Sequence, residues 1–216
     1  MLTTTVPHSD DFELDGALTH PAWEASPWLP LTPCDGGPGF ATRARMLWSD
    51  TGIYAAFDGE AGRLTCTLDE DNVDLYREDV FEWFLWPEES QIAYFEYEIS
   101  PRGKHLPIMV NNDGQGAFYG WLPWHLEGPR AIRRAVAVRG GEAHSGARVS
   151  GWSAAVFLPF ALFRGLRRCP PQRGEAWRGN CYRIDHDTGH DRHYAWSPVT
   201  AFNFHHYHEF GRFIFA

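Results

Sequence analysis

The sequence has few cysteines, no long apolar run and fewer basic than acidic residues, and each shortage excludes a class of protein. Its four Cys show no CxxC spacing, so free thiols are predicted. The longest apolar runs, such as residues 80–86, are far too short to span a membrane. The sequence shows no basic segment followed by an apolar region, the pattern that would indicate a secretory signal. We therefore expect a cytoplasmic protein with no membrane partner.

A shortage of positive charge argues against a nucleic-acid partner. The 19 Lys and Arg against 28 Asp and Glu give a net charge of −9, whereas nucleic-acid-binding proteins usually present a basic stripe. The charge is also uneven, because residues 58–98 carry thirteen acids and residues 127–183 carry eleven Arg. These two parts are expected to meet and neutralise each other. The chain also lacks a GxSxG nucleophile motif and a phosphate-binding loop.

Aromatic residues are abundant, with 10 Trp, 15 Phe and 8 Tyr in 216 residues. Trp is costly to place where it neither packs nor binds, so some of these rings are expected to face a ligand. Short strand-like segments alternate with Gly and Pro turns, and no repeat appears. The pattern predicts a single domain over residues 1–216. It would be an all-β, two-sheet antiparallel sandwich of the jelly-roll or immunoglobulin-like kind, with roughly ten strands and one short helix within 159–166.

The densest aromatic and acidic segment, residues 75–103, predicts a β-hairpin with strands over 79–86 and 91–99. Alternation in the second strand places Glu96 and Glu98 with Tyr94 on one face, which we expect to be solvated. A four-residue turn would set Glu82 opposite Phe95 or Glu96, and if Glu96 is the partner the three Glu share that face.

Glu82 lies between apolar residues in the first of these strands, and a lone carboxylate there must be hydrogen-bonded, paired or open to a ligand. Rings beside carboxylates suit a sugar, because rings stack on the C–H faces of a pyranose and charged groups bind its hydroxyls. An ordinary sandwich strand whose Glu pairs with an Arg explains the same residues equally well.

The Gly- and Pro-rich segment 111–129 carries four more rings, Phe118, Tyr119, Trp121 and Trp124. Aromatic residues on such a loop either plug an open sandwich edge or form one wall of a pocket, and we favour the wall.

Several short segments, taken in order along the chain, resemble the family 9 carbohydrate-binding modules and their stand-alone bacterial relatives. They are LDGALTHPAW at 14–23, LWSDTGIYAAF at 47–57, LYREDVFEWFL at 75–85, YFEYEISPRG at 94–103, GWSAAVFLPF at 151–160, WRGNCYRID at 177–185, WSP at 196–198 and FG at 210–211.

This resemblance implies a sandwich, of the broader DOMON-like type, that holds a saccharide between two rings with Glu, Arg and amide groups on its hydroxyls. Tyr76 stands where the family often has a stacking Trp, Glu82 matches the Glu of its D-x-x-E pattern, and Trp196 is the candidate opposing ring. The full set of candidate ligand contacts is Tyr76, Glu82, Glu96, Glu98, Arg102, Trp121, Trp124, Asn180, Arg183 and Trp196.

Relatives in this family also bind calcium, for which Asp69, Asp71 and Asp74 are candidate ligands, although an exposed acidic loop is the simpler interpretation. Six of the eleven His lie within 186–208. Because Gly189 and flanking Asp indicate a loop, we favour rim histidines over a metal site built from His186, His190 and His193.

Two other functions remain open at this stage. A small sugar-active lyase, hydrolase or isomerase would use Glu82 with His206 and His208, alone or with a metal. A b-type haem protein on the same fold would use Met46 or Met109 with a late His, although Met in the core is the simpler interpretation.

Overall fold

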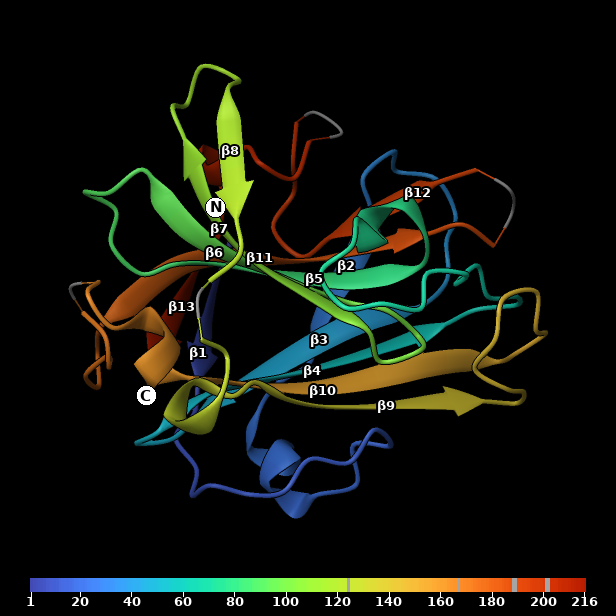
Figure 1. Ribbon diagram of the computed structural model, residues 1–216, viewed down its shortest axis with the longest axis horizontal. Helices are drawn as coiled ribbons and strands as arrows, with labels where there is room; N and C mark the ends of the chain where they lie inside the picture. Colours follow the sequence, from blue (N-terminus) through green and yellow to red (C-terminus); the bar gives the residue numbers. More distant parts are fainter. Residues whose placement is uncertain (124, 167, 188–189, 201–202) are drawn as a thin grey trace.

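The computed structural model describes residues 1–123, 125–166, 168–187, 190–200 and 203–216. It is a β-sandwich of two packed layers (Figure 1). The strands are β1 (Thr3–Val6), β2 (Leu29–Pro33), β3 (Thr42–Trp48), β4 (Gly52–Glu60), β5 (Val80–Trp86), β6 (Ala93–Ile99), β7 (His105–Asn112), β8 (Phe118–Trp121), β9 (Arg133–Arg139), β10 (Gly151–Pro159), β11 (Ala176–Asp185), β12 (Arg192–Ala195) and β13 (Gly211–Phe215).

The helical segments in the described part of the chain are short 3-10 turns. They are η1 (Pro21–Ala25), η2 (Leu75–Arg77), η3 (Gly128–Arg130), η4 (Phe160–Phe163) and η5 (Tyr207–Glu209). The sandwich prediction is confirmed, and η4 is the short helix expected near that position. The strand number of roughly ten was too low, because short strands such as β1, β8 and β12 span too few residues to alternate visibly. Among the described helices, none is long and apolar enough to cross a bilayer.

One hydrogen-bonded path runs through both layers, in the order β8-β7-β6-β5-β11-β12-β2-β3-β4-β10-β9. The pairings along it are antiparallel, whereas β1 joins β13 in parallel. The short strand β2 pairs with β12 in one layer and with β3 in the other, so it connects the two layers (Figure 1). The path ends at β8 and β9.

The main core lies between the layers and is built largely from rings. Phe81 of β5 stacks on Trp152 of β10 with ring centroids 3.9 Å apart, and both side chains are fully buried. Alternation turns Glu82 and Phe84 toward the opposite face of β5, where a second apolar cluster covers them. Both faces of β5 are therefore buried, which is why its sequence is almost continuously apolar.

The register of the β5–β6 hairpin differs from the prediction. Glu82 pairs with Glu98, and Phe84 pairs with Glu96. The predicted four-residue turn was too short, since β6 begins only at Ala93 and residues 87–92 form the connection. The three Glu share a face, as the alternative with Glu96 opposite Glu82 predicts, because Glu98 is two residues from Glu96.

The acidic and basic parts of the chain meet, as expected from their charge. Arg134 of β9 lies 2.8 Å from Asp71, and Arg139 lies 2.8 Å from Asp58. These ion pairs bring the basic strand β9 against the acidic segments that flank β4 and β5.

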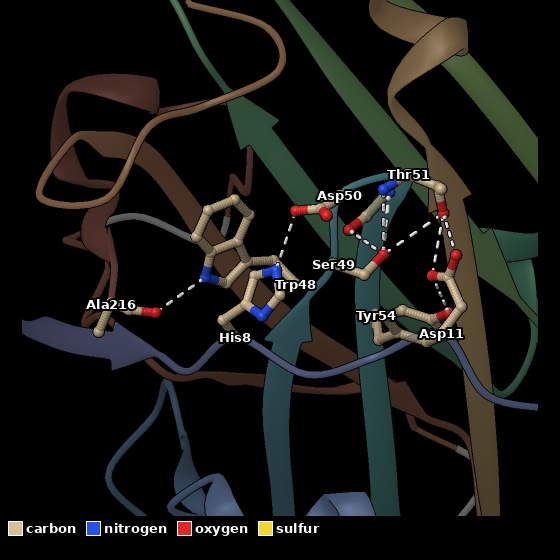
Figure 2. Close-up of polar contacts among 9 residues, drawn as sticks. His8, Asp11, Trp48, Ser49, Asp50, Thr51, Tyr54 and Ala216 are labelled. Carbon is tan, nitrogen blue, oxygen red and sulfur yellow. Dashed lines mark hydrogen bonds and ion pairs between the residues drawn. The ribbon is translucent and has the colours of Figure 1, made fainter.

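The segment after β1 is tied to the turn between β3 and β4 (Figure 2). The indole N–H of Trp48 donates to the carbonyl of Ala216 at 3.1 Å, and Tyr54 Oη donates to Asp11 at 2.9 Å. Thr51 Oγ1 donates to both oxygens of the same carboxylate. Asp11 therefore joins the N-terminal segment to β4.

Replacing Asp11 with Ala is expected to lower the free energy of unfolding by about 1 kcal/mol, because exposed hydrogen bonds to a charged group are partly screened by solvent. Burial alone would raise the Asp11 pKa, but hydrogen bonds from Ser49, Thr51 and Tyr54 outweigh it and lower that pKa. The contribution is therefore present at neutral pH and is lost as the pH falls through the lowered pKa. Urea unfolding at neutral pH measures it, and an unchanged midpoint would contradict the role of this contact.

Candidate functional site

A cavity of about 410 Å³ opens on the face of β5, β6 and β7 that is turned away from the main core. This volume lies within the range of small-molecule sites, about 300–1,000 Å³. The residues that line it are Asp74, Tyr76, Glu82, Glu96, Glu98, Leu106, Ile108, Val110, Phe118, Gly120, Ile184, His193, Asn203, Phe204 and His205.

Three carboxyl groups, those of Glu82, Glu96 and Glu98, lie together in this lining. Glu82 and Glu98 are cross-strand partners, and Glu96 follows two residues before Glu98 on the same face of β6. Their exposed fractions are 2%, 5% and 1%. The prediction that this face is solvated was therefore wrong, because the residues of η5 and the segment before it cover the sheet here.

Burial and mutual repulsion shift the protonation of these carboxyl groups. Burial raises the Glu96 pKa to about 7. Burial, followed by the charge of Glu96, raises the Glu82 pKa well above its usual value. The Glu98 pKa is also raised, first by burial and then by the charges of Glu82 and Glu96. At neutral pH the cavity therefore holds protonated carboxyl groups, which can donate as well as accept hydrogen bonds.

Two exposed rings belong to the cavity, Tyr76 from η2 and Phe118 from β8, with exposed fractions of 45% and 42%. Phe118 stacks on His205 at 3.8 Å between ring centroids, and Phe204 stacks on buried Tyr182 at 3.9 Å. The prediction that the segment after β7 forms a pocket wall is confirmed for Phe118.

His205 joins the rings to the carboxyl groups. Its Nδ1 lies 2.6 Å from Tyr94 Oη and 4.0 Å from Glu96 Oε2. Burial, and then the charge of His206, lowers the His205 pKa to about 4, so the imidazole is neutral at pH 7. The sequence gives no periodicity that separates this His from its neighbours.

Three predicted contacts are buried elsewhere and were wrong. Trp196 is 5% exposed and stacks on Phe213 in the main core, so it cannot be the opposing ring. Asn180 is fully buried and donates to the carbonyl of Ser197 at 2.8 Å. Arg183 faces the core between the layers, where its Nη1 donates to Thr42 Oγ1 at 2.8 Å.

The remaining predicted contacts lie outside the cavity lining or outside the described residues. Arg102 pairs with Asp69 at 2.8 Å. Trp121 is 50% exposed, but alternation along β8 points it away from the face that carries Phe118 and Gly120. Trp124 is not among the described residues.

The predicted metal ligands do not gather in one place. Asp69, Asp71 and Asp74 pair with three different cations, Arg102, Arg134 and Arg77. In the described ranges, no three His, Cys, Asp or Glu side chains are arranged to hold a metal ion, and this includes His186, His190 and His193.

The histidines and methionines named for the two alternative functions are not in the lining that holds the carboxyl groups. His206 and His208 line a second cavity of about 410 Å³, which shares Phe118, Asn203 and His205 with the first but does not contain Glu82. Met46 is buried in the main core and Met109 packs against that core, so both predicted haem ligands are packing residues.

No protein-family model matches the sequence, and no curated protein matches it. Three solved structures are similar over nearly the whole chain. A protein of Bacteroides uniformis ATCC 8492, to which carbohydrate binding has been provisionally assigned, is 16% identical with a TM-score of 0.79, covering 100% of this chain and 99% of that one. A family 9 carbohydrate-binding module of Caldicellulosiruptor kristjanssonii in complex with cellotriose is 12% identical with a TM-score of 0.68, covering 99% and 93%.

The same kind of module in complex with glucose is 11% identical with a TM-score of 0.68, covering 99% of this chain and 96% of that one. At these identities the likeness is one of architecture. The chain has the β-sandwich fold of the family 9 carbohydrate-binding modules.

Proposed function

We propose that this chain binds a carbohydrate in the cavity above Glu82, Glu96 and Glu98. The observation that carries the proposal is the placement of exposed rings, Tyr76 and Phe118, in the same cavity as buried carboxyl groups. Rings offer a surface for the C–H faces of a pyranose, and carboxyl groups bind hydroxyls in either protonation state. The fold supports the same conclusion, because two similar structures hold cellotriose and glucose.

The cavity has the balance of surfaces that a small polar ligand needs. Leu106, Ile108 and Val110 of β7 supply an apolar side, while the carboxyl cluster and a few other side chains supply the polar groups. Binding sites for small molecules commonly combine a mainly apolar lining with a few directed polar groups. Such a site fixes the orientation of a sugar through its hydroxyl pattern.

Replacing Tyr76 with Ala is expected to weaken binding of glucose or cellotriose about tenfold, since one stacked ring contributes on the order of 1.4 kcal/mol. Isothermal titration calorimetry against a panel of mono- and oligosaccharides measures this loss. Tyr119→Ala is the matched control, because Tyr119 is 74% exposed and lies on the opposite face of β8 from Phe118.

Two results would contradict the proposal. One is the absence of saturable binding to every saccharide of the panel. The other is an equal effect of Tyr76→Ala and Tyr119→Ala, which would place the sugar outside this cavity.

A sugar-active enzyme is the second candidate, and the raised pKa of Glu96, about 7, favours it. A carboxyl group that titrates near neutral pH in a cavity can serve as general acid or base. Mass spectrometry of each saccharide after incubation with the protein would detect a product. Turnover that disappears in Glu82→Gln while the sugar still binds would support catalysis, and saturable binding without any product would exclude it for that panel.

A further inference from the structure

The described cavity lining contains acidic side chains without basic ones to balance them. Four acids line it, Asp74, Glu82, Glu96 and Glu98, and the described lining residues include no Lys or Arg. At its rim, Asp74 pairs with Arg77 at 3.0 Å. A cavity for a neutral sugar does not require such an excess of acid, because amide and hydroxyl groups also bind hydroxyls.

Glu98 gives an independent indication of a missing hydrogen-bond donor. Its side chain is 1% exposed, and its Oε2 has no hydrogen-bond partner. The backbone of Tyr76 and the side chain of Glu96 both hydrogen-bond to the Glu98 carboxyl group, yet Oε2 itself has no partner. A buried carboxyl oxygen without a donor is costly, so this atom is placed to receive one from a ligand.

The groups around the carboxyl cluster do not supply positive charge. The titratable neighbours are Tyr94 from β6, Tyr182 from β11, His193 from β12, His205 before η5, and Asp74 and Tyr76 at η2. Burial raises the pKa of Tyr94 and Tyr182, so both phenols stay neutral. Burial also lowers the pKa of His193 and His205, which keeps both imidazoles uncharged at neutral pH.

A ligand cation would favour the charged form of the carboxyl group that it contacts. A divalent metal ion is a poor fit, because no metal-holding group of three acidic or imidazole side chains exists in the described residues. An ammonium group fits better, since it offers three N–H donors without demanding a fixed coordination geometry. Exposed Tyr76 and Phe118 add ring faces, which also attract cations.

We propose that the cavity selects an amino sugar, a saccharide unit whose protonated amine donates hydrogen bonds to Glu98 and its carboxyl neighbours while its ring packs against Tyr76 and Phe118. The inference rests on the proposed carbohydrate binding and names its substrate class. No covalent bond changes. Binding transfers only a proton, because a carboxyl group that pairs with the ammonium releases its own proton to solvent.

The test compares D-glucosamine, D-glucose and N-acetyl-D-glucosamine by titration calorimetry at pH 7. Glucosamine is expected to bind at least about tenfold more tightly than glucose, since charge-assisted hydrogen bonds in a buried site are about twice as strong as neutral ones. N-acetylglucosamine keeps the nitrogen but loses the charge, so it should lack this gain. Measurements in two buffers with different ionisation enthalpies should show proton release for glucosamine alone.

Glu98→Gln should reduce the preference for glucosamine over glucose, and Glu142→Gln should leave it unchanged. Glu142 is the matched control because its side chain is 88% exposed on the turn between β9 and β10. If Glu98→Gln does not fold, the comparison of the three sugars on the parent protein still decides the question.

Equal or weaker binding of glucosamine, with glucose still bound, would overturn the inference and leave carbohydrate binding intact. Binding of none of the three sugars, nor of any saccharide in the wider panel, would overturn both. Cyclohexylamine carries the charge without the hydroxyls, and binding of this amine as tightly as glucosamine would also overturn the selection of a sugar.

Discussion

Replacing Glu96 with Gln is expected to stabilise the protein by about 3 kcal/mol more at about pH 8 than at about pH 5. Burial raises the Glu96 pKa from 4.5 to about 7 in the folded protein. Folding therefore takes up a proton between these values, and its stabilising effect is complete below about pH 4.5 and lost as the pH rises to about 7. The difference between the two pKa values corresponds to about 3 kcal/mol, and Gln does not titrate.

The comparison must be made between variant and parent, because other buried groups act with the opposite sign. Burial lowers the pKa of His105 and His205 to about 4. The unfolded chain takes up protons on these imidazoles as the pH falls below about 6.5, so they destabilise the fold at acidic pH. Both proteins contain His105, and its effect cancels in the difference between the two unfolding free energies. His205, Glu82 and Glu98 lie beside Glu96 and respond to its replacement, so the measured difference belongs to this cluster as a whole.

Urea unfolding of the parent, Glu96→Gln and the exposed control Glu142→Gln at both pH values measures this effect. The control should show the same pH profile as the parent. If the free energies of unfolding of Glu96→Gln and the parent differ by the same amount at both pH values, Glu96 is not buried as a protonated acid.

Replacing Trp152 with Ala is expected to lower the free energy of unfolding by about 3–5 kcal/mol, the largest effect of any single substitution considered for this fold. Trp152 is fully buried in β10 and stacks on Phe81 of β5, so it joins the two layers directly. Its removal leaves a cavity beneath the strand that carries Glu82. Thermal or urea unfolding measures the loss.

Trp152→Phe separates packing from hydrogen bonding at the same position. The indole Nε1 of Trp152 is buried and has no hydrogen-bond partner. Phe keeps a ring against Phe81 and removes this unsatisfied donor, so its cost should be below about 1.5 kcal/mol. A cost equal to that of Ala would show that the indole N–H is satisfied in solution.

The acidic side of the site could be predicted from the sequence because side chains two residues apart in a β-strand always lie on the same face. Glu96 and Glu98 share a face in any β-strand, and pairing with the preceding strand brings Glu82 to the same face whenever the register shift is even. The actual hairpin differs in this way from the alternative that paired Glu82 with Glu96, so that alternative identified the cluster although not the cross-strand partners. The burial of the cluster was missed because the residues that cover it, among them Phe204 and Phe210, lie roughly 120 positions further along the chain.

The rest of the site depends on long-range packing that no local pattern encodes. Trp196 and Tyr76 are both aromatic residues in strongly aromatic surroundings, yet one is in the core and the other exposed. Arg183 alternates with Tyr182 and Ile184 along β11, but the sequence does not show which face of that strand meets the other layer. His205 becomes part of the cavity only because Phe118 and Tyr94 approach it from other strands.

The place of β8 at the end of the strand path has a consequence for how this architecture can diversify. Phe118 stands on a strand that pairs with β7 alone and projects past the layer (Figure 1). Insertions, deletions or exchanges in residues 113–117, which precede Phe118, can shift this ring without interrupting a ladder that is paired on both sides. Ligand specificity can therefore change between proteins of this fold while the hydrophobic core stays the same.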